Sequence, residues 1–173
     1  LVRAEKELLH GTLRGSINVL TEVLSLVNPE AFGRSSRIKR YVRQLGEHFQ
    51  IKQMWRLEMA AMLSQIGCVI LPQETLKKLY EGQVLSQEEQ QLFDMHPSLG
   101  SNLLGNIPKL EEVARIIALQ EKHYDGGGFP DDGPKGEEIP VGARILKAVL
   151  DFDLLVTAGE KKNQAFASLH ELA

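Results

Sequence analysis

The chain has 173 residues, of which 43% are hydrophobic and 25% charged, with a net charge of -3 at neutral pH. This composition is typical of one globular domain that is large enough to bury a hydrophobic core. The acidic balance argues against a general nucleic-acid-binding protein, which would carry a basic excess. No apolar run approaches the length of a membrane span. The single cysteine, Cys68, excludes an internal disulfide, and we expect a cytoplasmic protein with no nucleic-acid partner and no membrane span.

Apolar residues recur at helical spacing over the first 27 or so residues, which predicts one long amphipathic helix. Asn28 and Pro29 are expected to end it. The stripe consists of Leu9, Leu13, Ile17, Leu20, Leu24 and Val27. The chain starts inside this helix and without a methionine, so we expect it to be part of a longer protein. Residues 1–27 would then be a linker helix, separate from a domain of residues 28–173.

Apolar periodicity or a start signal predicts six further helices. The start signals include a capping box that begins at Ser86 and prolines at the first position of a helix. The predicted helices run from about Ser35, over Trp55–Ile66, over Gln73–Tyr80, from Ser86, from Pro108 and from Pro140. No segment alternates with a period of two for long enough to predict a strand. The expected fold class is all-α, a bundle of about six or seven helices after the long first helix.

One segment between about His123 and Pro140 interrupts the helical pattern. It is rich in Gly, Pro and Asp, and three consecutive glycines, Gly126 to Gly128, permit positive φ angles and close backbone approach. The segment is either a flexible connector or a functional loop. Its length favours a functional loop, because loops beyond about a dozen residues in compact domains are usually functional or disordered.

Five segments resemble, in order along the chain, the sequence motifs of HD-GYP domains. Asp125–Pro130 is similar to the D-G-x-G-Y-P signature, with Phe129 in place of the tyrosine. The other four are Gly33–Ile38, Ala60–Cys68, Leu71–Gly100 and Ala143–Leu155. The resemblance covers roughly residues 28–156. It implies an HD-domain-like helical fold in a bacterial signal-transduction or response-regulator protein.

The resemblance also implies a metal site, because members of this family hydrolyse cyclic di-GMP with iron or manganese ions held by histidines and carboxylates. Most positions that match these ligands or their neighbours hold other residues here, namely Arg34, Ser64, Gln65, Gln120, Glu121, Lys122 and Leu150. Arg34 would add a permanent positive charge. The remaining candidate ligands are His96, Glu30 and Glu121, and His96 is alternatively a hydrogen-bonded core histidine. We therefore expect no catalytic residue and no cofactor, with iron or manganese only if the metal site is retained.

These altered positions predict a non-catalytic output domain that acts by protein–protein interaction. The alternatives are a metal-dependent phosphohydrolase acting on cyclic di-GMP and a cyclic-dinucleotide receptor that does not hydrolyse its ligand. Arg34 and Arg37 are candidates for a phosphate contact in the receptor.

The resemblance implies several partners. In the family the glycine loop is thought to contact diguanylate cyclases, so the expected interaction residues are Asp125, Gly126, Gly128, Phe129 and Pro130. Phe129 is either an exposed anchor for a partner or a side chain that fills the core. We also expect an upstream receiver or sensor domain in the same chain. The apolar first helix is expected to pair with a second copy or with an upstream helix.

Overall fold

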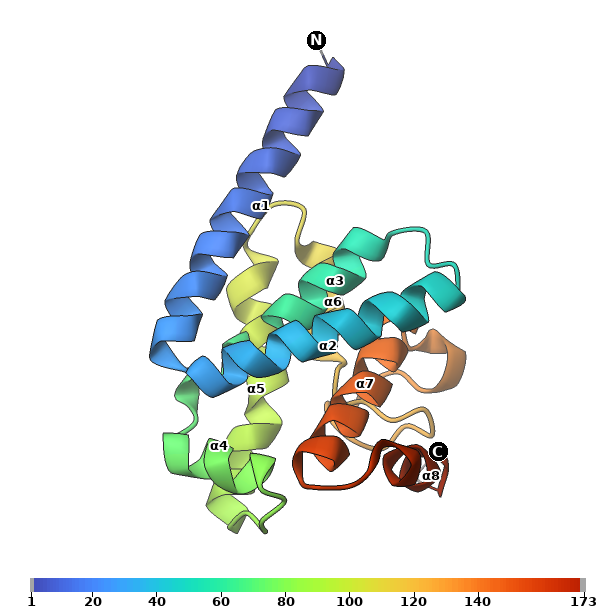
Figure 1. The fold of residues 1–173 in the computed structure, drawn as a ribbon. Helices are drawn as coiled ribbons and strands as arrows, with labels where there is room; N and C mark the ends of the chain where they lie inside the picture. The colour runs from blue at the N-terminus through green and yellow to red at the C-terminus, as the bar shows by residue number, and fades with distance from the viewer. Residues whose placement is uncertain (1, 172–173) are drawn as a thin grey trace.

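The computed structural model describes residues 2–171, without the side chains of residues 2–10, 14, 24, 32, 170 and 171. Over this part of the chain it contains eight α-helices, two 3-10 helices and one isolated antiparallel bridge, which confirms the all-α prediction (Figure 1). No described helix is long and apolar enough to cross a membrane. The elements are α1 (Val2–Val27), α2 (Pro29–His48), α3 (Met54–Leu63), η1 (Ile66–Ile70), α4 (Gln73–Tyr80), α5 (Gln87–Gly105), α6 (Glu111–Ala118), η2 (Gly136–Glu138), α7 (Val141–Thr157) and α8 (Lys162–Glu171).

Two helix starts illustrate how the local sequence sets the boundaries. The Asn28 side chain accepts a hydrogen bond from the Ala31 amide at 3.0 Å, and Pro29 takes the first helical position, where its missing N–H costs nothing. α2 therefore begins at Pro29, and the predicted start near Ser35 was wrong. The predicted capping box of α5 is confirmed, with the Glu89 amide bonded to Ser86 Oγ at 3.2 Å and the reciprocal bond also present.

Two other boundaries and one whole helix differ from the prediction. The helix expected from Pro108 begins at Glu111, because Lys109 has a positive φ of 72° and breaks the helical path. α3 ends at Leu63, and the chain continues through a turn into η1. α8 was not predicted, because it has no apolar stripe of helical period. Its Ala165 is buried, and its mostly exposed Phe166 packs on Phe152 at 4.6 Å between ring centroids.

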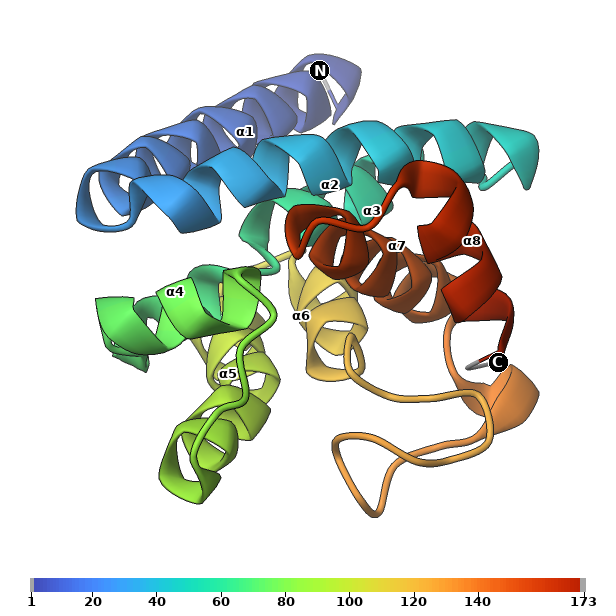
Figure 2. The same cartoon turned by 60° about the horizontal axis from the view of Figure 1, so that its bottom comes forward.

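The main core lies where α2, α3, α6 and α7 meet, and α2 crosses over α3 and α7 (Figures 1 and 2). α1 packs on this body through Leu13 and Ile17, whereas its first turns project away from the bundle (Figure 1). Leu20 and Val27 of the predicted stripe are exposed instead, and the side chains of Leu9 and Leu24 lie outside the described residues.

Candidate functional site

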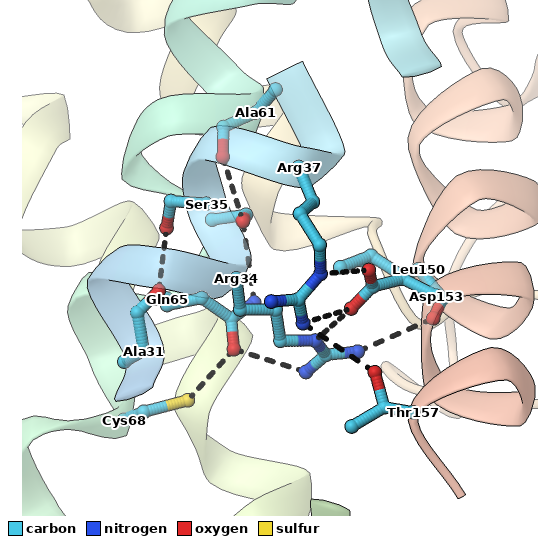
Figure 3. A network of polar contacts seen from close by, with 11 residues as sticks. Ala31, Arg34, Ser35, Arg37, Ala61, Gln65, Cys68, Leu150, Asp153 and Thr157 are labelled. Atoms are coloured by element: carbon cyan, nitrogen blue, oxygen red, sulfur yellow. Dashed lines mark hydrogen bonds and ion pairs between the residues drawn. The ribbon is translucent and has the colours of Figure 1, made fainter. Parts of the chain in front are cut away.

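Arg34 on α2 lies at the centre of a buried polar network and is only 5% exposed (Figure 3). Its Nε donates to Asp153 Oδ2 at 3.1 Å, its Nη1 to Gln65 Oε1 at 3.1 Å, and its Nη2 to the Leu150 carbonyl at 3.2 Å. Each nitrogen of the guanidinium therefore has an acceptor. The three acceptors come from α7 and from the turn after α3, so this one side chain cross-links three parts of the bundle.

Asp153 is the buried counter-ion of two arginines. Arg37 donates from Nε to Oδ1 at 2.9 Å and from Nη2 to Oδ2 at 3.3 Å, in addition to the bond from Arg34. The Arg34 guanidinium also lies over the Tyr80 ring, with its central carbon 5.3 Å from the ring centroid. Burial raises the pKa of Tyr80 to about 12, so its hydroxyl remains protonated at neutral pH. Both carboxylate oxygens of Asp153 are thus occupied by guanidinium groups.

Ser64 and Gln65 stand where the resemblance places the His-Asp pair of the family, and both are buried. Gln65 accepts from Arg34, and its Nε2 donates to Ser64 Oγ at 3.2 Å. The Cys68 thiol points at Gln65 Oε1 at 3.6 Å. Burial raises the pKa of Cys68 to about 12, so this thiol is not a nucleophile at neutral pH.

His96 on α5 is 1% exposed and has a partner on each ring nitrogen. The Gln120 amide nitrogen donates to the Ser64 carbonyl at 3.0 Å, which fixes its orientation. The 2.7 Å contact between this nitrogen and His96 Nε2 therefore uses the ring's lone pair, and Nδ1 donates to the Phe93 carbonyl. Burial lowers the pKa of His96, which favours this neutral ring. These contacts support the interpretation of His96 as a core histidine.

The two other candidate ligands, Glu121 and Glu30, have other surroundings. Glu121 lies in an ion-paired cluster, in which Lys147 Nζ contacts Glu121 at 3.2 Å and Asp151 at 2.7 Å. Burial opposes the charge of Lys147, but Glu121 and Asp151 outweigh it and raise its pKa. Glu30 is exposed on the first turn of α2. Among the residues that the structure describes, no three His, Cys, Asp or Glu side chains are placed to hold a metal ion.

This set of donors and cations does not fit a di-metal centre. The carboxylates nearest to the altered positions are already neutralised, Asp153 by two arginines and Glu121 by Lys147. A dication would meet the fixed charge of Arg34, which cannot deprotonate in a protein.

The glycine loop, defined here as residues 123–135, follows α6 and lies on the opposite side of the domain from α1 (Figure 2). Gly126 and Gly128 have φ angles of +100° and +68°, and a Cβ on Gly128 would lie 2.0 Å from the Glu121 carbonyl oxygen. A Cβ on Gly127 would approach no atom closer than 3.2 Å. The backbone thus requires glycine at the first and third positions only.

Two features of the loop were missed or left open by the sequence. Phe129 is 37% exposed and lies outside both buried clusters, which favours an exposed anchor over a core residue. Lys122, which directly precedes the loop, is 1% exposed and bonds to three loop carbonyls. In the sequence Lys122 stands out only as an altered position, since a lysine gives no sequence signal that it will be buried.

Comparison with known proteins defines the class of protein. Residues 18–173 match the family model described as HD domain, so the chain belongs to the HD domain family. It is 38% identical over 104 residues to the cyclic di-GMP phosphodiesterase response regulator RpfG of Xanthomonas campestris pv. campestris (strain 8004), which covers 59% of this chain and 26% of RpfG. It is 24% identical over 142 residues to the 3'3'-cGAMP-specific phosphodiesterase 3 of Vibrio cholerae serotype O1 (strain ATCC 39315 / El Tor Inaba N16961), which covers 80% of this chain and 30% of that protein. The matched part is thus less than a third of either relative, and the matches confirm the resemblance to HD-GYP domains.

Proposed function

We propose that this chain is an HD-GYP-type signalling domain that acts through protein–protein contacts and not through hydrolysis. The observation that carries this proposal is the buried Arg34, whose guanidinium has acceptors on all three nitrogens at a position where the resemblance places a histidine. Metal-centred phosphodiester hydrolysis needs a cluster of histidines and carboxylates with an open position for water. We propose that no such cluster forms here, because Arg34 adds a positive charge, Lys147 pairs with Glu121, and His96 is hydrogen-bonded to Gln120.

The glycine loop is the proposed contact surface, with diguanylate cyclase-type proteins as the proposed partners. Phe129 and Tyr124 are 37% and 54% exposed, and the loop is held by hydrogen bonds that involve no metal. An exposed aromatic ring on a rigid backbone loses little entropy on binding and is a typical interface anchor. RpfG is named as a response regulator, and we propose that a receiver or sensor domain likewise precedes this chain, with α1 as the connection.

A second candidate function is hydrolysis of a cyclic dinucleotide, which the names of both relatives favour. It would require iron or manganese at a rebuilt site that includes His96, Glu30 or Glu121. A receptor without hydrolysis is a variant of this function. It would use the cavity of about 380 Å³ beside Arg34 and Arg37, which Glu30 and Lys77 also line. The two acids, Glu30 and Glu81, offset much of the positive charge there, which makes this cavity a poor dianion site.

The proposal is tested by assaying the purified domain with cyclic di-GMP and 3'3'-cGAMP in the presence of iron or manganese, and by measuring its binding to purified diguanylate cyclases of the source organism. We expect no turnover above background and binding that Phe129→Ala removes with little change in melting temperature. Phe49→Ala is the control, because Phe49 is an exposed aromatic outside the loop.

Turnover that scales with protein and disappears in His96→Ala or Glu121→Ala would establish the second candidate. A large fall in melting temperature with unaffected binding would show that Phe129 is a core residue.

A further inference from the structure

Lys122 is among the largest side chains of the described residues that are fully buried, with 1% of its surface exposed. It follows α6 directly and points into the glycine loop. Its Nζ donates to the carbonyl oxygens of Gly126 at 2.6 Å, Pro130 at 2.7 Å and Asp131 at 3.3 Å. An ammonium group has three N–H donors, and each of them has one of these oxygens as its acceptor.

The acceptors are unusual for a buried charge, because they are neutral peptide carbonyls. A buried ammonium is costly unless all of its donors are paired, and here the pairing comes only from loop backbone. The three carbonyls converge on one point because the chain reverses direction between Gly126 and Asp131. Such a ring of carbonyl oxygens is the environment in which proteins also bind dehydrated monovalent cations.

Backbone hydrogen bonds also hold parts of the loop. The amide of Phe129 bonds to the Glu121 carbonyl at 3.2 Å, that of His123 to the Gly127 carbonyl at 2.9 Å, and that of Gly133 to the Pro130 carbonyl at 3.1 Å. Each of these bonds lies close to the chain reversal. The Lys122 ammonium connects the first arm of the loop, at Gly126, with the second arm at Pro130 and Asp131. At the base of the loop, the amide of Gly136 bonds to the Tyr124 carbonyl at 2.8 Å.

We infer that Lys122 is an internal cation that holds the two arms of the glycine loop together and thereby positions Phe129. The side chain takes the place of a bound cation at the centre of the loop. This inference rests on the proposed function only in its consequence for binding, since Phe129 is the proposed anchor. Lys122 is a positioning residue and does not itself reach the surface.

The test uses Lys122→Ala, which empties the carbonyl ring, with hydrogen exchange of the loop amides as the readout. We expect the amides of Phe129 and Gly133 to exchange at least about tenfold faster, because charge-assisted hydrogen bonds are lost, while amides of α6 and α7 keep their protection. Added n-propylammonium restores the carbons and the ammonium that the substitution removes, and should restore protection. The isosteric but uncharged n-propanol should not. Lys135→Ala is the control, because Lys135 is an exposed lysine of the same loop.

Three results would overturn the inference. These are unchanged loop exchange in Lys122→Ala, rescue by n-propanol equal to that by n-propylammonium, and loosening of the loop to the same extent in Lys135→Ala. If Lys122→Ala fails to fold, Lys122→Met keeps the apolar stem without the charge, and a protected loop in that variant would equally refute the role of the cation. Binding of diguanylate cyclases is measured separately. A loosened and rescued loop with unaffected binding would leave the inference intact and refute the proposed function.

Discussion

At the scale of single residues, Arg34 does what a bound ion does in a metalloprotein, because it gathers acceptors from distant parts of the chain around one positive charge. Its partner Asp153 lies 119 positions away in the sequence, and Gln65 lies 31 positions away. Buried ions destabilise a fold unless every donor and acceptor is paired. Each guanidinium nitrogen of Arg34 and both carboxylate oxygens of Asp153 have a partner, and the two ion pairs hold α2 to α7 (Figure 3).

Arg34→Met should lower the free energy of unfolding by about 3 kcal/mol, at the lower end for breaking a buried ion pair, because Arg37 still neutralises Asp153. The substitution leaves Gln65 Oε1 and the Leu150 carbonyl without their Arg34 donor. Urea unfolding at neutral pH measures the loss. Arg43→Met is the control, since the Arg43–Glu58 pair is exposed on the arginine side and should contribute no measurable stability. An equal loss of unfolding free energy in the two variants would show that the buried network contributes no more stability than an exposed ion pair.

His96 should make stability depend on pH. Burial lowers its pKa in the folded state below the ordinary value, so the unfolded chain binds a proton more readily. The stability is complete above the unfolded pKa of about 6.5 and is lost as the pH falls toward the folded pKa. We expect the free energy of unfolding to fall from pH 7.5 to pH 5.5, by up to about 1.4 kcal/mol per pH unit. This component should be absent in His96→Gln and unchanged in His48→Gln, an exposed histidine.

At the scale of elements, the three glycines of the glycine loop differ: the backbone conformation requires glycine at positions 126 and 128 but not at position 127. Gly128→Ala should destabilise the domain by about 2 kcal/mol or more, because its φ is positive and its Cβ would collide with the Glu121 carbonyl. Gly127→Ala should be nearly neutral, since no atom lies closer than 3.2 Å to its Cβ. Thermal unfolding of both variants makes the comparison. Equal melting temperatures would mean that the loop has no fixed backbone in solution.

The elements also show which parts of the fold were accessible from the sequence. The first helix, α4 and the capping box of α5 were predicted correctly, because each depends on local periodicity or a local cap. The start of α2 was placed six residues too late, because Asn28 and Pro29 were interpreted only as the end of the helix before them. α8 was missed because its contacts are tertiary, through Phe166 on α7.

The candidate site was accessible only in part. The motifs that the chain resembles place Arg34, Ser64 and Gln65 at positions of expected ligands, and the absence of a metal site there stays a prediction. The pairing of Arg34 with Asp153 could not be predicted, because a contact across 119 residues leaves no mark on local spacing. The burial of Lys122 depends in the same way on where the loop carbonyls converge.

At the scale of the whole molecule, α1 has a second apolar face that the described domain does not cover. Leu13 and Ile17 pack inward, whereas another set of apolar side chains is 40–83% exposed. This set consists of Val19, Leu20, Val23, Leu26 and Val27. A helix that is apolar on two faces is expected to have a second partner, and the spacing suits a helix pair.

We expect sedimentation to show a dimer for this chain or for the full-length protein. Val23→Glu combined with Leu26→Glu should give folded monomers with unchanged helix content by circular dichroism, because both side chains are exposed in the monomer. The control is Gly11→Glu with Asn18→Glu, which adds the same charges at exposed positions of α1 on the side away from Val23 and Leu26. Monomers throughout, for this chain and for the full-length protein, would refute pairing through α1.

The metal content of the domain tests the central claim most directly. Protein purified from medium supplemented with iron, manganese and zinc is analysed for these elements, together with His96→Ala. We expect far less than one equivalent of any of them in both proteins, because Arg34 and Lys147 neutralise the carboxylates that a dication would need. One or more equivalents of a transition metal that are lost in His96→Ala would contradict this expectation.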